Sequence, residues 1–476
     1  MNAKLILCLI VFVPIAGALI LPFFGSISKK FRNIAALVLV ATSVILSIVA
    51  LPSAISGSPL QFNVEFPLGF NFGFLGDGLA VFMALVSAFI GVIIIYYSWG
   101  YIDHYKNQSE YYLMVVLFLG SMMGIVYTTN LIFLFVFWEI SAICCWRLIG
   151  FYREKEHIIK ADKAFLVTVF GALVMLAGFI LIYVETGTLD MIALRGHKIS
   201  NLAVILILFG IFSKSATLPL HTWLPDAGVA PSPVTSLLHA AVLVKIGVYV
   251  FARLFLITFS IDPMWHTVIP IIVAVSALVS AGAALMETDI KRIIAYSTVS
   301  QIAFIFLGLA TGSVVGAAGA IIYILMHGLA KGGLFLCAGI IEQNTGTKDL
   351  RKLGGLITTM PMTAISFIIC ALSVMGIPPL GGFFSKMMVI NGAVMANEPW
   401  IAITFVIGAV LTLLYMLRLF VKIFFGENKF PDVKEGSFTM VSSVIMLAVL
   451  SILGGLLINY PADFVNEIVK QMAILY

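Results

Sequence analysis

The chain has 476 residues, of which 62% are hydrophobic and only 10% are charged, and its formal net charge is +5 at pH 7. Soluble domains carry about 25% charged residues, so this composition excludes an ordinary soluble enzyme and predicts a protein embedded in a lipid bilayer. The basic residues form no patch with interleaved aromatic side chains, which argues against nucleic acid as a partner.

In chain order, about fourteen apolar stretches follow one another, and each is long enough to cross a hydrocarbon core of about 30 Å as a helix. Lys4 is the only basic residue at the start of the first stretch, which we therefore interpret as a span and not as a secretory signal. The predicted spans are 4–24, 33–52, 79–101, 111–129, 131–151, 163–185, 201–222, 232–254, 266–286, 291–311, 316–342, 357–394, 400–425 and 437–459.

The distribution of lysine and arginine predicts the orientation of these spans. Sixteen basic residues lie in the segments that follow odd-numbered spans, and five lie on the other side: Lys4, Arg195, Lys198, Arg253 and Lys470. Because basic residues concentrate on the cytoplasmic side, both termini are predicted outside. We expect a multi-pass protein of the cell (inner) membrane.

Two of the predicted spans contain prolines close to a lysine. Lys214 precedes Pro219 in "SKSATLPLHTWLP", and Lys386 follows Pro378 and Pro379 in "GIPPLGGFFSK". Proline interrupts a helix, and paired interruptions in two halves of a transporter mark its ion path. Ordinary kinks are the alternative, since proline is common in membrane helices.

The breaks fall in spans seven and twelve, five spans apart. They predict an all-α polytopic fold in which spans 4–8 and 9–13 are two five-helix repeats, inverted because the number of helices in each is odd. The chain 1–476 is then one transmembrane domain with three helices in 1–110, a first repeat in 111–254, a second in 266–425 and a C-terminal helix in 437–476.

Other ionisable residues also lie within predicted spans. They are Glu139 in "FLFVFWEISAICCW", His239 and Lys245 in span eight, and His327 and Lys331, four residues apart on one face of span eleven. A charged side chain at mid-membrane costs about 2.5–3.5 kcal/mol on insertion scales, and such residues often form proton relays. Desolvation lowers the pKa of a buried lysine and a nearby carboxylate raises it. A hydrogen-bonded core histidine is the alternative for His239 and His327.

Proton entrances from the inner side are predicted in two segments. His221 and Asp226 belong to the loop "HTWLPDAGVAPSP", where a turn-capping role for Asp226 is equally compatible with the pattern. Asp162 lies in "YREKEHIIKADK", near the start of span six.

The sequence predicts no cofactor and no metal. All five cysteines lie in apolar spans and form no C-x-x-C pair: Cys8, Cys144, Cys145, Cys337 and Cys370. There is also no nucleotide-binding glycine motif or cluster ligand set, so we expect no redox catalysis in this chain.

Four segments in order resemble the antiporter-like subunits of respiratory complex I, of Mrp-type Na⁺/H⁺ antiporters and of membrane-bound hydrogenases. They read "KSATLPLHTWLPDAGVAPSPVTSLLHAAVLVKIGVY", "ETDIKRIIAYSTVSQ", "HGLAKGGLFLCAG" and "GIPPLGGFFSK". The resemblance implies fourteen helices, broken helices seven and twelve, and proton transfer along a polar axis at mid-membrane.

The resemblance also implies a role for each ionisable residue of the first repeat. Glu139 would pair with Lys214, and Lys245 with the nearby His239 would form the centre of the relay. Breaking the pair between Glu139 and Lys214 would leave an isolated buried ammonium, whose proton would then move toward Lys245.

In the second repeat, the resemblance implies that His327 and Lys331 continue the relay and that Lys386 ends it. Some members of the family carry a glutamate at that last position. We expect other membrane subunits as partners, including related antiporter-like subunits, and protons as the transported ion, with Na⁺ as a second candidate.

Three functions fit these patterns. The first is a proton-translocating subunit of a complex I-like or hydrogenase-type oxidoreductase, which His239 and the "HTWLPDAG" segment favour. The second is a subunit of an Mrp-type antiporter without redox chemistry. The third, a scaffold that moves no ions, is the weakest because every relay position carries a titratable side chain.

Overall fold

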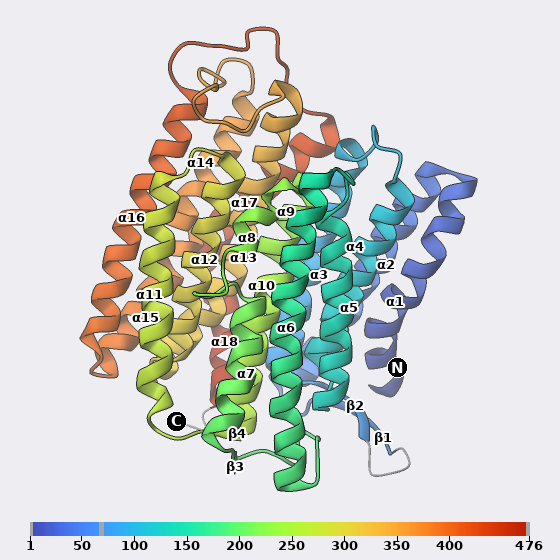
Figure 1. Ribbon diagram of the computed structural model, residues 1–476, viewed down its shortest axis with the longest axis vertical. Helices are drawn as coiled ribbons and strands as arrows, with labels where there is room; N and C mark the ends of the chain where they lie inside the picture. Colours follow the sequence, from blue (N-terminus) through green and yellow to red (C-terminus); the bar gives the residue numbers. More distant parts are fainter. Residues whose placement is uncertain (1–2, 66–70, 473–476) are drawn as a thin grey trace.

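The computed structural model describes residues 3–65 and 71–472 as a bundle of helices (Figure 1). Within these ranges, twelve helical segments are long and apolar enough to cross a membrane, and two shorter apolar helices complete the set of fourteen. The shorter helices, Asn201–Lys214 and Pro361–Met375, belong to the two spans that were predicted to be broken. The all-α polytopic prediction is therefore confirmed.

The long helices pack side by side across the bundle. They are α1 (Ala3–Ile27), α2 (Lys29–Ile55), α3 (Gly78–Tyr101), α4 (Gln108–Tyr127), α5 (Leu131–Ile149), α6 (Lys155–Thr186), α11 (Trp265–Met286), α12 (Ile290–Leu309), α13 (Val314–Thr345), α16 (Pro399–Phe424) and α17 (Phe438–Leu456). Span eight is built from four consecutive pieces, α9 (Ser232–Ser236), η3 (Leu237–Ala241), α10 (Leu243–Arg253) and η4 (Leu254–Thr258).

The broken spans end where the sequence stops supporting a helix. Helix α7 (Asn201–Lys214) ends before Pro219, and the chain resumes helical structure only in α8 (Trp223–Asp226) and η2 (Ala227–Val229). Helix α14 (Pro361–Met375) ends just before Gly376, whose φ of +84° lies in the left-handed region that glycine favours. Helix α15 (Gly381–Met395) completes span twelve after the two prolines.

A repeated pentapeptide marks the two halves of the bundle. The sequence T-G-T-x-D occurs at 186–190, after α6, and again 159 residues later at 345–349, after α13. Each copy closes with a backbone bridge to the residue before a helix, Asn130 with Asp190 before α5, and Asp289 with Asp349 before α12. The same two backbone hydrogen bonds flank each bridge.

The two pentapeptides lie at opposite ends of the bundle, one at the lower end and one at the upper end of Figure 1. Helices α5 and α6 therefore correspond to α12 and α13 in reversed orientation, as expected for spans five and six against ten and eleven of two inverted repeats. The repeated turn supports the division that the prolines predicted, and it was readable in the sequence.

Span eight is not a uniform helix. Its centre is a π turn, in which the N–H of Val242 donates to the carbonyl of Leu237 over 3.0 Å. Val242 has φ −127° and ψ −71°, which are not helical values, so the regular α-helix α10 begins at Leu243. Such turns are frequent at functional sites, and this one lies between His239 and Lys245.

Several elements were not predicted. A hairpin of β1 (Leu60–Glu65) and β2 (Asn71–Gly76) precedes α3, and a short parallel pair joins β3 (His197–Lys198) to β4 (Phe259–Ser260). The region 437–476, expected as one helix, contains α17 and the amphipathic α18 (Asn459–Met472), which buries Val465 and Ile468. Arg253, counted above with the outer segments, is a buried residue of α10.

Candidate functional site

In the first repeat, the end of α7 lies against α5. Lys214 is the last residue of α7, is fully buried, and donates from Nζ to the carbonyl of Trp138 over 3.3 Å. The ammonium also lies 5.2 Å from the centre of the Trp138 ring, a cation–π contact. Glu139, which follows Trp138 in the sequence, interacts electrostatically with Lys214.

Glu139 and Lys214 are brought together, but no ion pair of the described residues includes Glu139. Its side chain is half-buried, and Oε1 is a buried atom without a hydrogen-bond partner in the described ranges. A buried carboxylate oxygen without a partner is costly, so this group is available to a donor such as the Lys214 ammonium. The predicted pairing of the two side chains stays a prediction.

At the centre of the bundle, Lys245 of α10 reaches α13. Its Nζ donates to the carbonyl of Ala240 in the π turn. The same Nζ lies next to Gly328 of α13, only 2.5 Å from the position that a Cβ on this glycine would occupy. Gly328 follows His327, so the absence of a side chain there admits the amine of Lys245 next to the second repeat. His239 packs on Phe335 of α13, with ring centres 4.4 Å apart.

In the second repeat, Lys331 begins a chain of side-chain hydrogen bonds. Its Nζ donates to the Ile294 carbonyl at 3.0 Å and to Ser297 Oγ at 2.6 Å. Ser297 is hydrogen-bonded to the Tyr415 hydroxyl at 2.8 Å, and Tyr415 donates to Thr412 Oγ1 at 3.2 Å. Helices α12, α13 and α16 are therefore joined by polar side chains at the core of the bundle.

The chain of hydrogen bonds continues toward span twelve. Gln301 donates from Nε2 to Thr412 Oγ1 over 3.2 Å and accepts a hydrogen bond from the Tyr323 hydroxyl. The Lys386 ammonium lies 5.4 Å from the centre of the Tyr323 ring. Its Nζ donates to the carbonyl of Val374 over 2.6 Å. Side-chain contacts thus link the amines of Lys331 and Lys386 without a gap.

The histidines differ from the lysines in their partners. Both are fully buried, and neither ring nitrogen of His239 or of His327 has a hydrogen-bond partner among the residues described. Buried polar atoms are nearly always satisfied by protein or by water. A hydrogen-bonded core histidine, the alternative considered above, therefore lacks the protein partners that it requires.

The three predicted entrance residues have different contacts. Asp226 accepts hydrogen bonds from Lys163 at 2.7 Å and from Arg292 at 2.6 Å, and it makes no side-chain capping bond. Asp162 accepts one from the Trp146 indole at 2.8 Å. His221 lies in the segment between α7 and α8, where Nδ1 is buried without a partner in the described structure.

Asp226 lines a cavity of about 470 Å³ on the upper face, the predicted inner side. Burial raises the pKa of Asp226, but the hydrogen bonds and charges of Lys163 and Arg292 lower it more, so that its pKa lies below the ordinary value. Glu342 lines the same cavity and pairs with the buried Lys291 at 2.5 Å. The upper face thus carries a charged vestibule, of which the sequence predicted only Asp226.

Residues 128–412 match the family described as "NADH:quinone oxidoreductase/Mrp antiporter, TM", and this match covers more than half of the chain. The chain belongs to this family. Residues 64–112 match a second description, "NADH-Ubiquinone oxidoreductase (complex I), chain 5 N-terminus". The resemblance drawn from the four sequence segments is confirmed.

Curated relatives in this antiporter-like family are longer than the chain. It is similar to a Na⁺/H⁺ antiporter subunit A1 of Staphylococcus haemolyticus, with 35% identity over 85% of the chain and 54% of the relative. A Na⁺/H⁺ antiporter subunit A1 of Staphylococcus aureus is 32% identical over 97% of the chain and 62% of the relative. The chain thus spans between half and two thirds of the length of these relatives.

Two solved structures share the fold. A chain of the Mrp complex from Dietzia sp. DQ12-45-1b has a TM-score of 0.90 at 24% identity, covering 99% of this chain and 98% of that one. A chain of the membrane-bound sulfane sulfur reductase, an archaeal respiratory membrane complex, gives the same TM-score and identity over 98% and 97%. At this identity the likeness concerns the fold alone.

Proposed function

We propose that this chain is a proton-translocating subunit of an Mrp-type multisubunit cation/proton antiporter. The observation that supports the proposal is a set of titratable groups inside the bundle, with one lysine at each broken helix. Glu139 is half-buried and the other six are buried: Lys214, His239, Lys245, His327, Lys331 and Lys386. Isolated buried charges are expensive in a membrane, and this arrangement groups them on packed inner helices.

The first step of the proposed mechanism is a change at Glu139. While its carboxylate is close to Lys214, the ammonium form of Lys214 is favoured. When Glu139 moves away or is neutralised, the proton of Lys214 is released toward Lys245. Water is the partner that would satisfy the free nitrogens of His239 and His327 and carry the proton between the helices.

The second step passes the proton from the centre to span twelve. Lys245 lies against Gly328 and interacts electrostatically with the neighbouring His327, and Lys331 lies one turn beyond His327 along α13. From there the hydrogen bonds through Ser297 and Tyr415, and the contact of Tyr323 with Lys386, connect the centre to the second break. Gln301 stands in this connection as a fixed hydrogen-bonding group that holds Tyr323 in place.

The sequence alone favoured a redox complex as the first hypothesis. The names of the relatives favour an antiporter complex instead. Both curated relatives carry the name of a Na⁺/H⁺ antiporter subunit. The partners proposed here are other membrane subunits, and the exchanged ion is Na⁺. A proton-pumping subunit of a respiratory complex is the second candidate, because the fold matches the sulfane sulfur reductase chain as well as the Mrp chain.

The test uses the complex that copurifies with the full chain, reconstituted in liposomes that contain a pH-sensitive dye. We expect a pulse of Na⁺ to drive proton movement in the wild type, and Lys245→Ala to abolish it. Lys422→Ala, which removes an exposed lysine at the end of α16, is the matched control and keeps normal transport. Proton movement that requires an electron donor and ignores Na⁺ would replace the antiporter by the second candidate, and normal transport in Lys245→Ala would refute both.

A further inference from the structure

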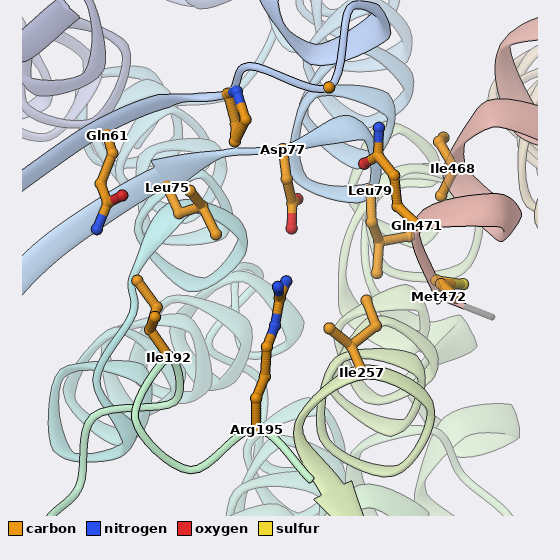
Figure 2. A pocket seen from close by; sticks show the side chains of 12 residues that line it. Gln61, Leu75, Asp77, Leu79, Ile192, Arg195, Ile257, Ile468, Gln471 and Met472 are labelled. Atoms are coloured by element: carbon orange, nitrogen blue, oxygen red, sulfur yellow. The ribbon is translucent and has the colours of Figure 1, made fainter. Parts of the chain in front are cut away.

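A cavity of about 340 Å³ lies at the end of the bundle that carries the described N- and C-terminal residues (Figures 1 and 2). Its walls come from the β1–β2 hairpin, the start of α3, the loop before β3, the π turn η4 and α18. Apolar side chains such as Leu79, Ile257 and Ile468 make up much of the lining. In the predicted orientation this cavity faces the outer side of the membrane.

Two charged side chains face each other across this cavity. Arg195 extends from the loop before β3 toward Asp77, which precedes α3 (Figure 2). Arg195 is exposed, and its guanidinium makes no hydrogen bond within the described ranges. It does interact electrostatically with Asp77. An exposed arginine held over a carboxylate in this way adds positive charge to the mouth of the cavity.

Behind the cavity wall, Asp77 is held by a second arginine. Arg253 donates two hydrogen bonds to the carboxylate, at 2.5 and 2.7 Å, and the side chains of the pair are 6% and 10% exposed. Asp77 also accepts the N–H of Ala80 and caps α3. A bidentate pair with this burial is a fixed part of the wall and not a mobile surface contact.

Arg253 connects the cavity to the centre of the bundle. Its Nε donates to the Tyr249 hydroxyl over 2.9 Å, and Tyr249 donates to the carbonyl of Val126 over 2.7 Å. Lys245, Tyr249 and Arg253 are four residues apart in succession, so they lie on one face of α10 with a rise of about 6 Å between neighbours. Tyr249 and Arg253 thus place polar side chains between the position of Lys245 and the outer cavity, on the same face of α10.

The net charge at the outer end of this face of α10 is positive and therefore repels cations. Two guanidinium groups and one carboxylate give a net charge of +1 around the inner end of the cavity. Positive groups at a constriction exclude protons and cations from a pore. We propose that Asp77, Arg195 and Arg253 form an outer seal, which prevents protons and cations in the outer cavity from reaching Lys245 along α10. This inference rests on the proposed function, because it treats Lys245 as a relay group.

The test measures passive proton leak through the reconstituted complex, driven by a potassium diffusion potential without Na⁺ or an electron donor. Arg195→Gln removes a unit charge from an exposed position and should raise the leak on the order of tenfold. Lys198→Gln removes an exposed positive charge from β3, outside the cavity, and should leave the leak unchanged. Adding Tyr249→Phe to Arg195→Gln should return the leak toward the wild-type value, because it removes the hydroxyl between Lys245 and Arg253.

An assembled Arg195→Gln complex that leaks no more than the wild type would overturn the seal. So would a leak that rises equally in Lys198→Gln, since the effect would then come from surface charge in general. The proposed function is judged separately by Na⁺-driven transport in the wild type and in Lys245→Ala. A wild type that transports protons, with Lys245→Ala inactive and Arg195→Gln without leak, refutes the seal alone.

Discussion

The two broken helices solve the same physical problem with different partners. Each break leaves the carbonyl groups at the C-terminal end of a half-helix without partners inside the helix, where the negative end of the helix dipole favours a cation. In span twelve, Lys386 reaches back across the break to the Val374 carbonyl. In span seven, Lys214 is itself the last helical residue, and the Ser213 carbonyl accepts the Trp223 indole N–H instead.

The difference lies in the acidic partner. Lys214 interacts with the carboxylate of Glu139, whereas Lys386 is held by a carbonyl group and the ring of Tyr323. A carboxylate can change its charge during a cycle, but a carbonyl and an aromatic ring cannot. In the proposed mechanism, the first repeat would therefore control the relay, and Lys386 of the second repeat would have a fixed terminal role.

The largest expected effect comes from removing the acidic partner. Glu139→Gln keeps the shape of the side chain but not its charge, and we expect Na⁺-driven proton transport to fall by about a hundredfold or more. Thr298 lies 159 residues later, at the equivalent position of α12, and Thr298→Val should change transport by less than about twofold. Dye-loaded liposomes measure both, and normal transport in assembled Glu139→Gln would contradict the asymmetry.

The junction between the repeats can be tested at Gly328. Gly328→Ala puts a Cβ 2.5 Å from Lys245 Nζ and should displace the amine, with a cost of about 1–3 kcal/mol and a loss of transport on the order of tenfold. Gly282→Ala in α11, where a Cβ meets no atom within 4 Å, is the matched control. Equal transport rates in the two variants would show that the contact of Lys245 with α13 is not used.

A smaller effect is expected at Tyr323, the partner of Lys386. Tyr323→Phe keeps the ring under the ammonium and loses the hydrogen bond to Gln301, so transport should fall only severalfold, by about 1 kcal/mol. Tyr323→Leu also loses the cation–π contact and should be slower by roughly a further 0.5–2 kcal/mol. If the two variants are equally active, the ring contributes nothing to the position of Lys386.

The smallest effect is expected at Asp226 on the upper face, outside the comparison of the two breaks. Its pKa is lowered in the folded protein, so its contribution to stability is present above its unfolded pKa of about 3.9 and is lost as the pH falls through the folded value. Asp226→Asn should therefore lower stability by at most about 1 kcal/mol at pH 7, because the pair is partly exposed.

Thermal unfolding of the detergent-solubilised protein measures this change, and the wild type and Asp226→Asn should converge as the pH falls below the lowered pKa of Asp226. Transport in the same variant tests the role of Asp226 as a proton entrance. A rate that falls at neutral pH without loss of stability would support that role, and an unchanged rate would leave the residue with a structural function only.

The spans and their breaks could be predicted because they depend on the chemical type of individual residues and on the length of apolar stretches. Apolar length sets a span, proline ends a helix, and a lysine such as Lys214 or Lys386 stands out in hydrocarbon. The relay candidates were all charged or titratable residues, because only such residues stand out in an apolar span. The repeated turn at 186–190 and 345–349 was an additional signal that comparing the two halves would have found.

The remaining parts of the site could not be predicted because their residues are individually ordinary. Ser297 and Tyr415 are 118 positions apart and become a hydrogen-bonded pair only when α12 and α16 pack together. Asp77 and Arg253 are separated by 176 positions, one at the start of α3 and the other at the end of α10. A serine, a tyrosine or a charged residue near a helix end gives no sign of such a partner in the sequence.

The π turn of span eight has a mechanical consequence. The carbonyl of Ala240 accepts a hydrogen bond from the side chain of Lys245, which is five residues ahead in the same span. Deprotonation would weaken this bond, because a neutral amine is a poorer donor than an ammonium group. In the proposed mechanism, the main chain at the middle of the protein would therefore respond to the charge of one amine. Each proton transferred through Lys245 would strengthen and then weaken the hydrogen bond that closes this five-residue loop of backbone.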